Sequence, residues 1–513
     1  MSVDVLFGQA YFLRFDPKLW DAQQPYAPLG TLYAAAAVRN DGWSVALFDA
    51  MLAGSVREWE TALDRNRPRV AVLYEDSFNY LSKMCLLRMR EAALEMVASA
   101  RARRITVVVA GSDATDHAAL YLDAGAACVI AGEGEVTLRH VIDSLGGRSA
   151  ASLAHIDGLV LRGGEGGITR TPPRAFVRDL DQLPAPAWDL VDVARYREIW
   201  HRRHGYFSMN IATTRGCPFH CNWCAKPIYG QRYASRAVEA VVDEMVWLKD
   251  TYRPDHLWIA DDIFGLKPGW IDAFAHQVVA RDARIPFKCL LRADGVTDGT
   301  ARALAAAGCQ TVWIGAESGS QRVLDAMQKG TTVGDIHRAT ALLRAAGIQV
   351  GFFLQFGYPG EVFEDVEATL RMVRTCRPDE IGVSVSYPLP GTSFFERVKA
   401  QLGRQQNWVD SDDLAMMYRG TFPPAFYRAL HALVHSEFRQ RRGLDALIKA
   451  VRRPMTISRR TLRAAVSGLL QALRWPMLRR RVVRLARRPS AGATTLTDTG
   501  GTLVGSHADL GVG

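Results

Sequence analysis

The chain has 513 residues, 48% of them hydrophobic and 23% charged, a composition that favours two or three globular domains and excludes a disordered chain. No apolar run reaches the roughly 18 residues needed to cross a bilayer, and residues 1–15 lack the basic start and apolar run of a signal peptide. The net charge of +10 is uneven: residues 441–488 carry 15 Lys or Arg and one acid, so the rest of the chain is slightly acidic.

Residues 1–147 alternate strand-like and helix-like stretches. Strands are predicted at 3–8, 43–49, 69–74, 105–110 and 128–131, and helices at 29–40, 86–102 and from 136 onward. This order predicts a parallel sheet with helices on both faces. Such sheets bind ligands at the carboxyl ends of their strands, where the loops 74–77, 111–113 and 132–135 would gather.

Three segments near these strand ends, residues 28–33, 111–115 and 132–135, together resemble a cobalamin (B12)-binding domain. A nucleotide-binding Rossmann domain is the generic alternative, but no GxGxxG follows the first strand. Glycine in such loops lets the backbone approach a bulky cofactor closely. The resemblance implies cobalamin contacts at Gly30, Gly111, Ser112, Gly132, Glu133 and Gly134.

The histidine ligand of cobalamin mutases has no counterpart here. The DxHxxG motif is absent, and no histidine precedes His117. We therefore expect cobalamin to bind without a histidine ligand, and His117 to be a surface residue at the start of a helix. Residues 148–200 are predicted as a linker, since they are rich in Gly, Ser, Thr and Pro and contain the stiff stretch Leu-Pro-Ala-Pro-Ala-Trp at 183–188.

Cys217, Cys221 and Cys224 lie in one loop after a strand predicted at 208–213. Thiolates select zinc, copper(I) or iron–sulfur clusters. A structural zinc site would need a fourth ligand, for which His220 is available. Three buried core cysteines are the plainest alternative, although their spacing fits neither strand nor helix periodicity. The third reading is a 4Fe-4S cluster with three cysteine ligands and one open iron.

The CxxxCxxC loop, with an aromatic Trp223 before its last cysteine, resembles the radical S-adenosylmethionine (SAM) superfamily. The resemblance implies that SAM binds the open iron and is cleaved to a 5'-deoxyadenosyl radical, which abstracts hydrogen from an unactivated carbon. It also implies an electron donor such as flavodoxin or ferredoxin. Because a cluster needs reduced thiols and the eight cysteines do not form a disulfide framework, we expect a cytoplasmic protein.

Residues 201–400 repeat a strand-helix unit six times, which predicts a partial (β/α)6 TIM-like barrel with its site at the C-terminal ends of the strands. Strands are predicted at 208–213, 256–260, 287–292, 311–315, 349–356 and 380–387. Helices are predicted at 237–250, 269–283, 298–307, 321–328, 333–346 and 364–374.

Candidate SAM-binding residues follow these strands. The resemblance places Asp261 and Asp262 near the SAM amino group, although either could instead cap a helix or turn. Arg292 could contact a carboxylate or form a salt bridge with Asp294. The resemblance also places Glu317 on the ribose hydroxyls, beside Ser318. It brings three further residues near the adenosine through their backbone: Gly357, Leu389 and Pro390. Outside the loop, Cys289, Cys309 and Cys376 are expected to be small buried hydrophobes.

Residues 401–488 are predicted to be helical and strongly basic at their end, and residues 489–513, rich in Gly, Thr and Ser, to be a disordered tail. The segment 452–488 could be a basic amphipathic helix on an anionic membrane surface or a solvated helix covering the core. No nucleic-acid partner is expected, because no nucleic-acid-binding module accompanies the charge.

The resemblance covers residues 1 to about 440 and implies a cobalamin-dependent radical SAM enzyme that methylates an unactivated carbon of a small-molecule or natural-product substrate. Two alternatives remain. One is a radical oxidative cyclase or other ring-forming enzyme, and the other is a non-catalytic cobalamin-binding sensor or carrier. The intact cysteine loop argues against the last, since a sensor needs no open iron.

Overall fold

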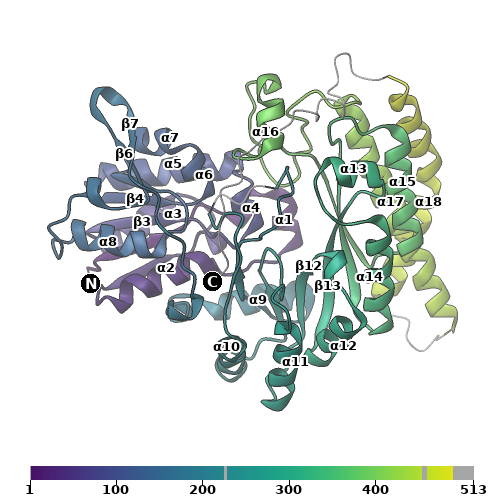
Figure 1. The fold of residues 1–513 in the computed structure, drawn as a ribbon, viewed down its shortest axis with the longest axis horizontal. Coiled ribbons are helices and arrows are strands. Elements are labelled where there is room, and N and C mark those ends of the chain that lie inside the picture. The colour runs from purple at the N-terminus through teal and green to yellow at the C-terminus, as the bar shows by residue number, and fades with distance from the viewer. Residues whose placement is uncertain (1, 225–227, 453–458, 489–513) are drawn as a thin grey trace, which may run out of the picture.

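The computed structural model describes residues 2–224, 228–452 and 459–488, so the predicted tail lies outside the described residues. An N-terminal α/β domain packs against a half-barrel, and a pair of long helices covers the far side of the half-barrel (Figure 1). The predicted fold class is confirmed.

The N-terminal sheet has seven strands in the order β2-β1-β3-β4-β5-β6-β7. The first five pair in parallel and the last two are antiparallel. Side chains alternate across the sheet: within β3, Ala71 and Leu73 join one core and Val72 and Tyr74 join the other. The strands are β1 Val5–Gly8, β2 Val45–Phe48, β3 Val70–Tyr74, β4 Thr106–Ala110, β5 Cys128–Ile130, β6 Leu159–Arg162 and β7 Ile168–Arg170.

Helices cover both faces of this sheet. α2 and α8 contribute to one core, and α3, α5 and α7 to the other. Two short helices, α1 and α4, lie between the sheet and the half-barrel (Figure 1). The helices are α1 Pro17–Ala22, α2 Leu29–Asn40, α3 Arg57–Asn66, α4 Tyr80–Lys83, α5 Leu87–Ala102, α6 Ser112–Asp116, α7 Ala118–Ala124 and α8 Glu135–Leu145.

The segment predicted as a linker, 148–200, contains regular structure, so this part of the prediction was wrong. Its first half supplies β6 and β7, and its second half ends in helix α9, Val193–His204. Leu159 and Val160 of β6 are buried against β5, which would otherwise present an unpaired edge. The two strands are short and joined by a Gly-rich turn, so their sequence resembles a loop.

All six strands of the half-barrel are parallel, in the order β15-β14-β13-β12-β11-β8. They are β8 Ser208–Ile211, β11 His256–Ile259, β12 Phe287–Leu291, β13 Cys309–Glu317, β14 Gln349–Phe356 and β15 Glu380–Val385. The helices between them are α10 Val238–Thr251, α11 Trp270–Ala280, α12 Asp298–Ala307, α13 Gln321–Ala326, α14 Val333–Ala345 and α15 Phe363–Cys376. Cys289, Cys309 and Cys376 are buried, as expected.

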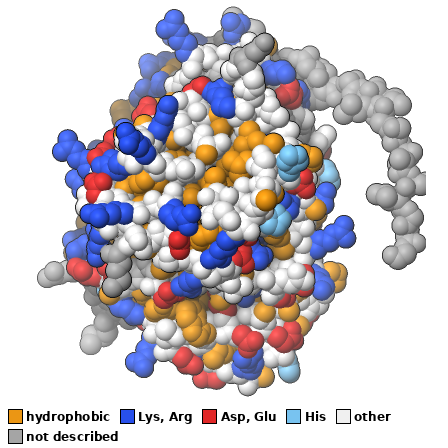
Figure 2. Space-filling view, turned by 90° about the vertical axis from the view of Figure 1, so that its left-hand side faces the viewer, with side chains coloured by type: hydrophobic (Ala, Val, Ile, Leu, Met, Phe, Trp, Pro, Cys, Tyr) orange, Lys and Arg blue, Asp and Glu red, His pale blue; other side chains and the backbone are white. Residues whose placement is uncertain are grey.

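After the short helix α16 (Ser393–Val398), helices α17 (Pro424–Arg452) and α18 (Arg459–Ala486) run side by side at the end of the molecule opposite the N-terminal domain (Figure 1). Within the described ranges, no helix is long and apolar enough to cross a membrane. On the opposite face, formed by the N-terminal domain, basic and acidic side chains are interspersed (Figure 2). The basic excess of the chain lies in residues 441–488, which carry 15 Lys or Arg and one acid.

Candidate active site

The three clustered cysteines lie in the loop that follows β8, at the C-terminal edge of the half-barrel sheet. Cys221 is buried, Cys217 and Cys224 are half-buried, and none of the three is in a disulfide. In the described part of the chain, no three His, Cys, Asp or Glu side chains converge as ligands of a single ion would. The thiols of a cluster loop need not converge in this way, because each binds a different iron. Three reduced thiols within one short loop therefore fit a 4Fe-4S cluster.

Gly216 sets the conformation of the backbone just before Cys217. Its φ is +76°, and a Cβ added there would lie 2.4 Å from the carbonyl oxygen of Arg232. The returning strand β10 (Ala234–Ser235) pairs with β9 (Thr214–Arg215), which brings Arg232 this close. Only glycine fits this position without a shift of the backbone.

We therefore expect Gly216→Ala to lower the free energy of unfolding by about 3 kcal/mol or more, because a steric clash adds to the cost of a left-handed residue. Gly205→Ala is the matched control: its φ is +80°, and nothing lies within 4 Å of the added Cβ. The control should lose only about 1–2 kcal/mol in the same urea denaturation. Equal losses for the two variants would show that the contact with Arg232 is unimportant.

Asn222, between the second and third cysteines, anchors the loop to the barrel. Its Nδ2 donates to the carbonyl of Ala326 at 2.8 Å, and its Oδ1 accepts from the hydroxyl of Tyr358 at 2.9 Å. Its backbone N–H donates to Met327, and its carbonyl accepts from the N–H of Phe394. Local sequence patterns do not indicate this role, because all four partners lie more than 100 residues away.

Asp261, at the end of β11, is fully engaged within the protein. Its carboxylate accepts from the backbone N–H groups of Thr213 at 2.7 Å and Thr214 at 3.0 Å, and from the hydroxyl of Thr213. Burial raises the pKa of Asp261 to about 6. Asp261 thus braces the start of the cysteine loop. Asp262 instead forms an ion pair at 2.5 Å with Lys83 of the N-terminal domain.

Glu317 forms a buried ion pair with Lys329, at 2.9 Å between Oε1 and Nζ. Burial lowers the pKa of the Lys329 amine, but Glu317 and Cys221 together outweigh burial, so the pKa is raised. Nζ of Lys329 also lies 5.9 Å from the ring centroid of Trp223. Gly315 leaves room for the pair, since a Cβ there would lie 2.7 Å from both Oε1 and Nζ. A buried cation thus adjoins the cysteine loop.

No sequence pattern predicted a role for Lys329, because this residue follows helix α13 without a recognisable motif. Arg292 forms a two-pronged salt bridge with Asp294 at 2.9 and 3.0 Å, one of the two alternatives predicted for it, while its contact with a carboxylate stays a prediction. Its guanidinium also lies 3.6 Å from the ring centroid of Phe219, within the cysteine loop.

The remaining predicted SAM contacts lie in loops that hydrogen bonds and one left-handed glycine stabilise. The hydroxyl of Ser318 is 3.1 Å from that of Thr369 and accepts from the N–H of Ser320. Gly357 has a φ of +81°. The carbonyl of Leu389 accepts from the hydroxyl of Thr392 at 2.7 Å, and Pro390 lies in the turn between them.

Glu361, fully buried, accepts a hydrogen bond from the N–H of Gly357 at 2.6 Å. Burial raises the pKa of Glu361 from 4.5 to about 8. A raised pKa means that this group favours the folded state most below about pH 4.5 and that its contribution is lost as the pH rises through about 8. Glu361→Gln keeps an acceptor for Gly357 and should flatten the fall in the free energy of unfolding between about pH 5 and pH 8. An unchanged slope in urea titrations would contradict this assignment.

In the N-terminal domain, two of the glycines predicted to contact cobalamin instead allow close packing against other side chains of the protein. A Cβ on Gly111, whose φ is +145°, would lie 2.6 Å from Cβ of Glu75, and one on Gly134 would lie 2.7 Å from the hydroxyl of Tyr74. Gly30 donates its N–H to Asp76 at 2.9 Å, and Ser112 is buried at the start of α6. His117 precedes α7 as its N-cap, as expected, but its side chain is half-buried, 3.9 Å from Asp113, rather than fully on the surface.

Gly132 differs from these glycines because it faces the half-barrel. Its φ is +83°, and the nearest described atom to an added Cβ is the carbonyl oxygen of Ile228, at 3.8 Å. Ile228 follows the cysteine loop in sequence. The loop after β5 and the loop after β8 therefore meet across the boundary between the two domains.

Arg215 ties these two loops together. It lies two residues before Cys217 and forms buried ion pairs with Glu133 at 2.5 Å and Glu135 at 2.7 Å. Its guanidinium is also within cation–π distance of three aromatic rings, those of Tyr33, Phe78 and Tyr229. Sequence reasoning identified Glu133 but missed Arg215, since the pairing spans about 80 residues.

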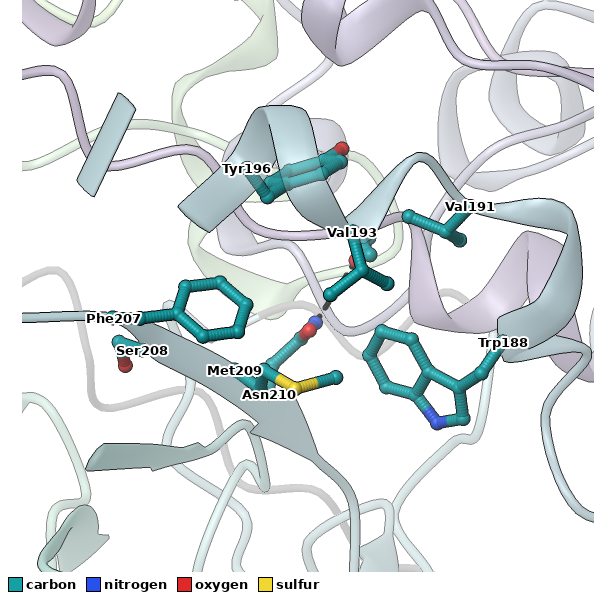
Figure 3. A pocket seen from close by; sticks show the side chains of 9 residues that line it. Trp188, Val191, Val193, Tyr196, Phe207, Ser208, Met209 and Asn210 are labelled. Atoms are coloured by element: carbon teal, nitrogen blue, oxygen red, sulfur yellow. Dashed lines mark hydrogen bonds between the residues drawn. The ribbon is translucent and has the colours of Figure 1, made fainter. Parts of the chain in front are cut away.

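A separate hollow lies between β8, the segment before α9 and the N-terminal domain (Figure 3). Its atom-free space is about 210 Å³, below the range of ligand pockets, so it is too small for cobalamin or SAM. Asn210 crosses it to donate to the carbonyl of Ala27 at 2.9 Å. It is lined by Ala27, Trp188, Val191, Val193, Tyr196, Phe207, Ser208, Met209 and Asn210.

Comparison with known proteins agrees with this division of the chain. The B12 binding domain matches residues 21–142, and the radical SAM superfamily matches residues 211–373. An uncharacterized methyltransferase of Pyrococcus horikoshii is 29% identical over 283 residues, which are 55% of this chain and 60% of the relative. The hopanoid C-3 methylase of Methylococcus capsulatus is 26% identical over 392 residues, 73% of this chain and 69% of the relative.

Two solved structures share the fold. The cobalamin-dependent radical enzyme OxsB superposes with a TM-score of 0.69 at 16% identity, covering 91% of this chain and 72% of that one. The methyltransferase TsrM of Kitasatospora setae superposes with a TM-score of 0.63 at 22% identity, covering 78% and 75%. The chain therefore carries a B12-binding domain followed by a radical SAM domain, in the order that the fold shows.

Proposed function

We propose that this protein is a cobalamin-dependent radical SAM enzyme that methylates an unactivated carbon of a small-molecule or natural-product substrate. The observation that carries the proposal is the buried contact of Arg215 with Glu133 and Glu135. This contact holds the cysteine loop against the loop that follows β5 in the B12-binding domain. Two cofactors bound on either side of it could act on one substrate.

Cys217, Cys221 and Cys224 would hold three irons of the cluster and leave the fourth for the amino and carboxylate groups of SAM. Lys329 supplies a buried positive charge beside Cys221 and Trp223, suited to the SAM carboxylate. Glu317 would accept hydrogen bonds from the ribose, with Ser318, Gly357, Leu389 and Pro390 shaping the adenosine site. Once bound, the cluster and SAM would supply radical chemistry at this edge of the half-barrel.

Asp261 would contribute indirectly, by bracing Thr213 and Thr214 at the start of the loop. Asp262 and Arg292 are engaged in ion pairs with Lys83 and Asp294. SAM would therefore have to replace a partner to contact either side chain directly.

Cobalamin would lie against the loops that contain Gly30, Gly111, Ser112 and Gly132, where the B12-binding domain faces the half-barrel. Gly132 leaves the most open backbone for its approach. Bound cobalamin would supply the methyl-transfer chemistry. A reduced flavodoxin or ferredoxin as electron donor and a cytoplasmic location complete the proposal, and both agree with eight cysteines that form no disulfide.

The names of the relatives favour methyl transfer. They include two methyltransferases and a methylase, and the TsrM structure was solved with a tryptophan substrate. The chain spans 60% of the Pyrococcus relative and about half of the anaerobic magnesium-protoporphyrin IX monomethyl ester cyclase of Rubrivivax gelatinosus, which is 25% identical over 278 residues. That cyclase makes ring formation the second candidate.

The deciding experiment uses the full chain, reconstituted anaerobically with iron, sulfide and cobalamin, with SAM labelled in its methyl group and a small-molecule extract. Methyl transfer predicts label in an extracted product together with 5'-deoxyadenosine. 5'-Deoxyadenosine without labelled product would favour the cyclase. S-Adenosylhomocysteine alone, with every extract, would exclude radical chemistry as the route.

A further inference from the structure

Helix α18 carries an apolar face that points away from the protein. Six large apolar side chains on it are between 53% and 73% exposed. Their spacing of three or four residues places them on one face of the helix. They are Leu462, Val466, Leu469, Leu470, Leu473 and Met477.

A different face of α18 makes the contacts with the body of the protein. Gly468 packs against the backbone of Gly443, so closely that a Cβ on Gly443 would lie 2.6 Å from Cα of Gly468. The indole of Trp475 donates to Glu437 at 2.8 Å, and Val482 is fully buried. The exposed face is therefore not used to cover the core.

Helix α17 adds apolar surface near the end where the two helices connect. Leu444, Leu447, Ile448 and Val451 are all exposed there. They follow one another at helical spacing. They lie beyond the part of α17 whose own side chains, such as Phe426 and Leu430, are buried. The exposed apolar surface of α18 is therefore joined by apolar side chains at the end of α17, the helix on which α18 packs.

Arginines surround this surface. The exposed arginines on α18 and directly after it are Arg463, Arg474, Arg480, Arg481, Arg484, Arg487 and Arg488. The only acid between residues 441 and 488 is Asp445, which pairs with Arg377 at 2.6 Å. Whatever covers the apolar face must therefore also accept a strong positive charge.

We propose that α18 and the adjoining end of α17 dock on the surface of a bilayer that contains anionic lipids. Leu and Met side chains would enter the headgroup and acyl boundary while the arginines pair with lipid phosphates. A second copy of the chain fits less well, because its own arginines would meet these across the contact. This inference is independent of the proposed catalytic function.

The test is sedimentation of the full chain with vesicles of phosphatidylcholine alone or with about one third phosphatidylglycerol. We expect binding to the anionic vesicles only, weakened at high salt because screening shortens the reach of surface charges. Leu469→Glu/Leu473→Glu should reduce partitioning about tenfold or more. The control is Val279→Glu, an equally exposed apolar residue on α11, which should bind as the wild type does.

Circular dichroism and iron content would show that the variants fold, and light scattering would report their oligomeric state. Wild-type binding by Leu469→Glu/Leu473→Glu, or no preference for anionic vesicles, would overturn the proposal. So would a dimer that dissociates on this substitution without any vesicle binding, since the face would then belong to a second copy.

Discussion

Cys221→Ala should lose the iron–sulfur cluster and all cleavage of SAM. After anaerobic reconstitution we expect about four iron and four sulfide per wild-type chain and well under half of that in the variant. Cys221 is the buried member of the three and acts electrostatically on Lys329, so its loss would remove both a proposed iron ligand and the sulfur that faces this cation.

Cys376→Ala is the matched control, since Cys376 is equally buried but lies at the end of α15, outside the loop. It should retain iron, sulfide and formation of 5'-deoxyadenosine. Iron content in Cys221→Ala equal to that of the wild type would refute the cluster assignment, and the same loss in Cys376→Ala would show that the effect is not specific to the loop.

Arg215→Met should destabilise the protein by about 3–5 kcal/mol, because it leaves Glu133 and Glu135 buried without their cation. Burial already raises the pKa of Glu133 in the wild type. A carboxyl with a raised pKa favours folding at low pH and loses that contribution as the pH rises, so the defect of Arg215→Met should shrink on acidification. Urea denaturation at several pH values measures both effects.

Adding Glu133→Gln and Glu135→Gln to Arg215→Met should restore much of the stability, since no buried charge then remains. Arg139→Met is the control: it breaks a two-pronged pair with Asp41 at the surface and should cost about 1 kcal/mol or less. Failure of the triple variant to recover would mean that Arg215 acts through packing against Tyr33, Phe78 and Tyr229 rather than through charge. Retention of cobalamin, followed by absorbance, reports whether the same contact also holds the domains for the cofactor.

The strands of both sheets were predictable because their side chains alternate or form short apolar runs. All six barrel strands and the first five strands of the N-terminal sheet lie where periodicity placed them. β6 and β7 were not predicted, because their own composition does not favour strands. β6 pairs with β5, and β7 pairs with β6. Helix α9 begins within the segment 148–200, which was predicted as a linker.

Some residues of the candidate site could likewise be identified from local sequence patterns, and others only from their tertiary contacts. Residue type and local spacing were enough to identify the cysteine loop, the glycine-containing turns and the acids at the strand ends as candidate site residues. Only the tertiary structure showed that Asp261 braces the cysteine loop, that Lys329 lies beside it, that Arg215 joins two domains, and that the apolar face of α18 points outward. Those features depend on contacts between residues far apart in the chain, and local patterns carry no information about which distant side chain will satisfy a buried charge or cover a helix face.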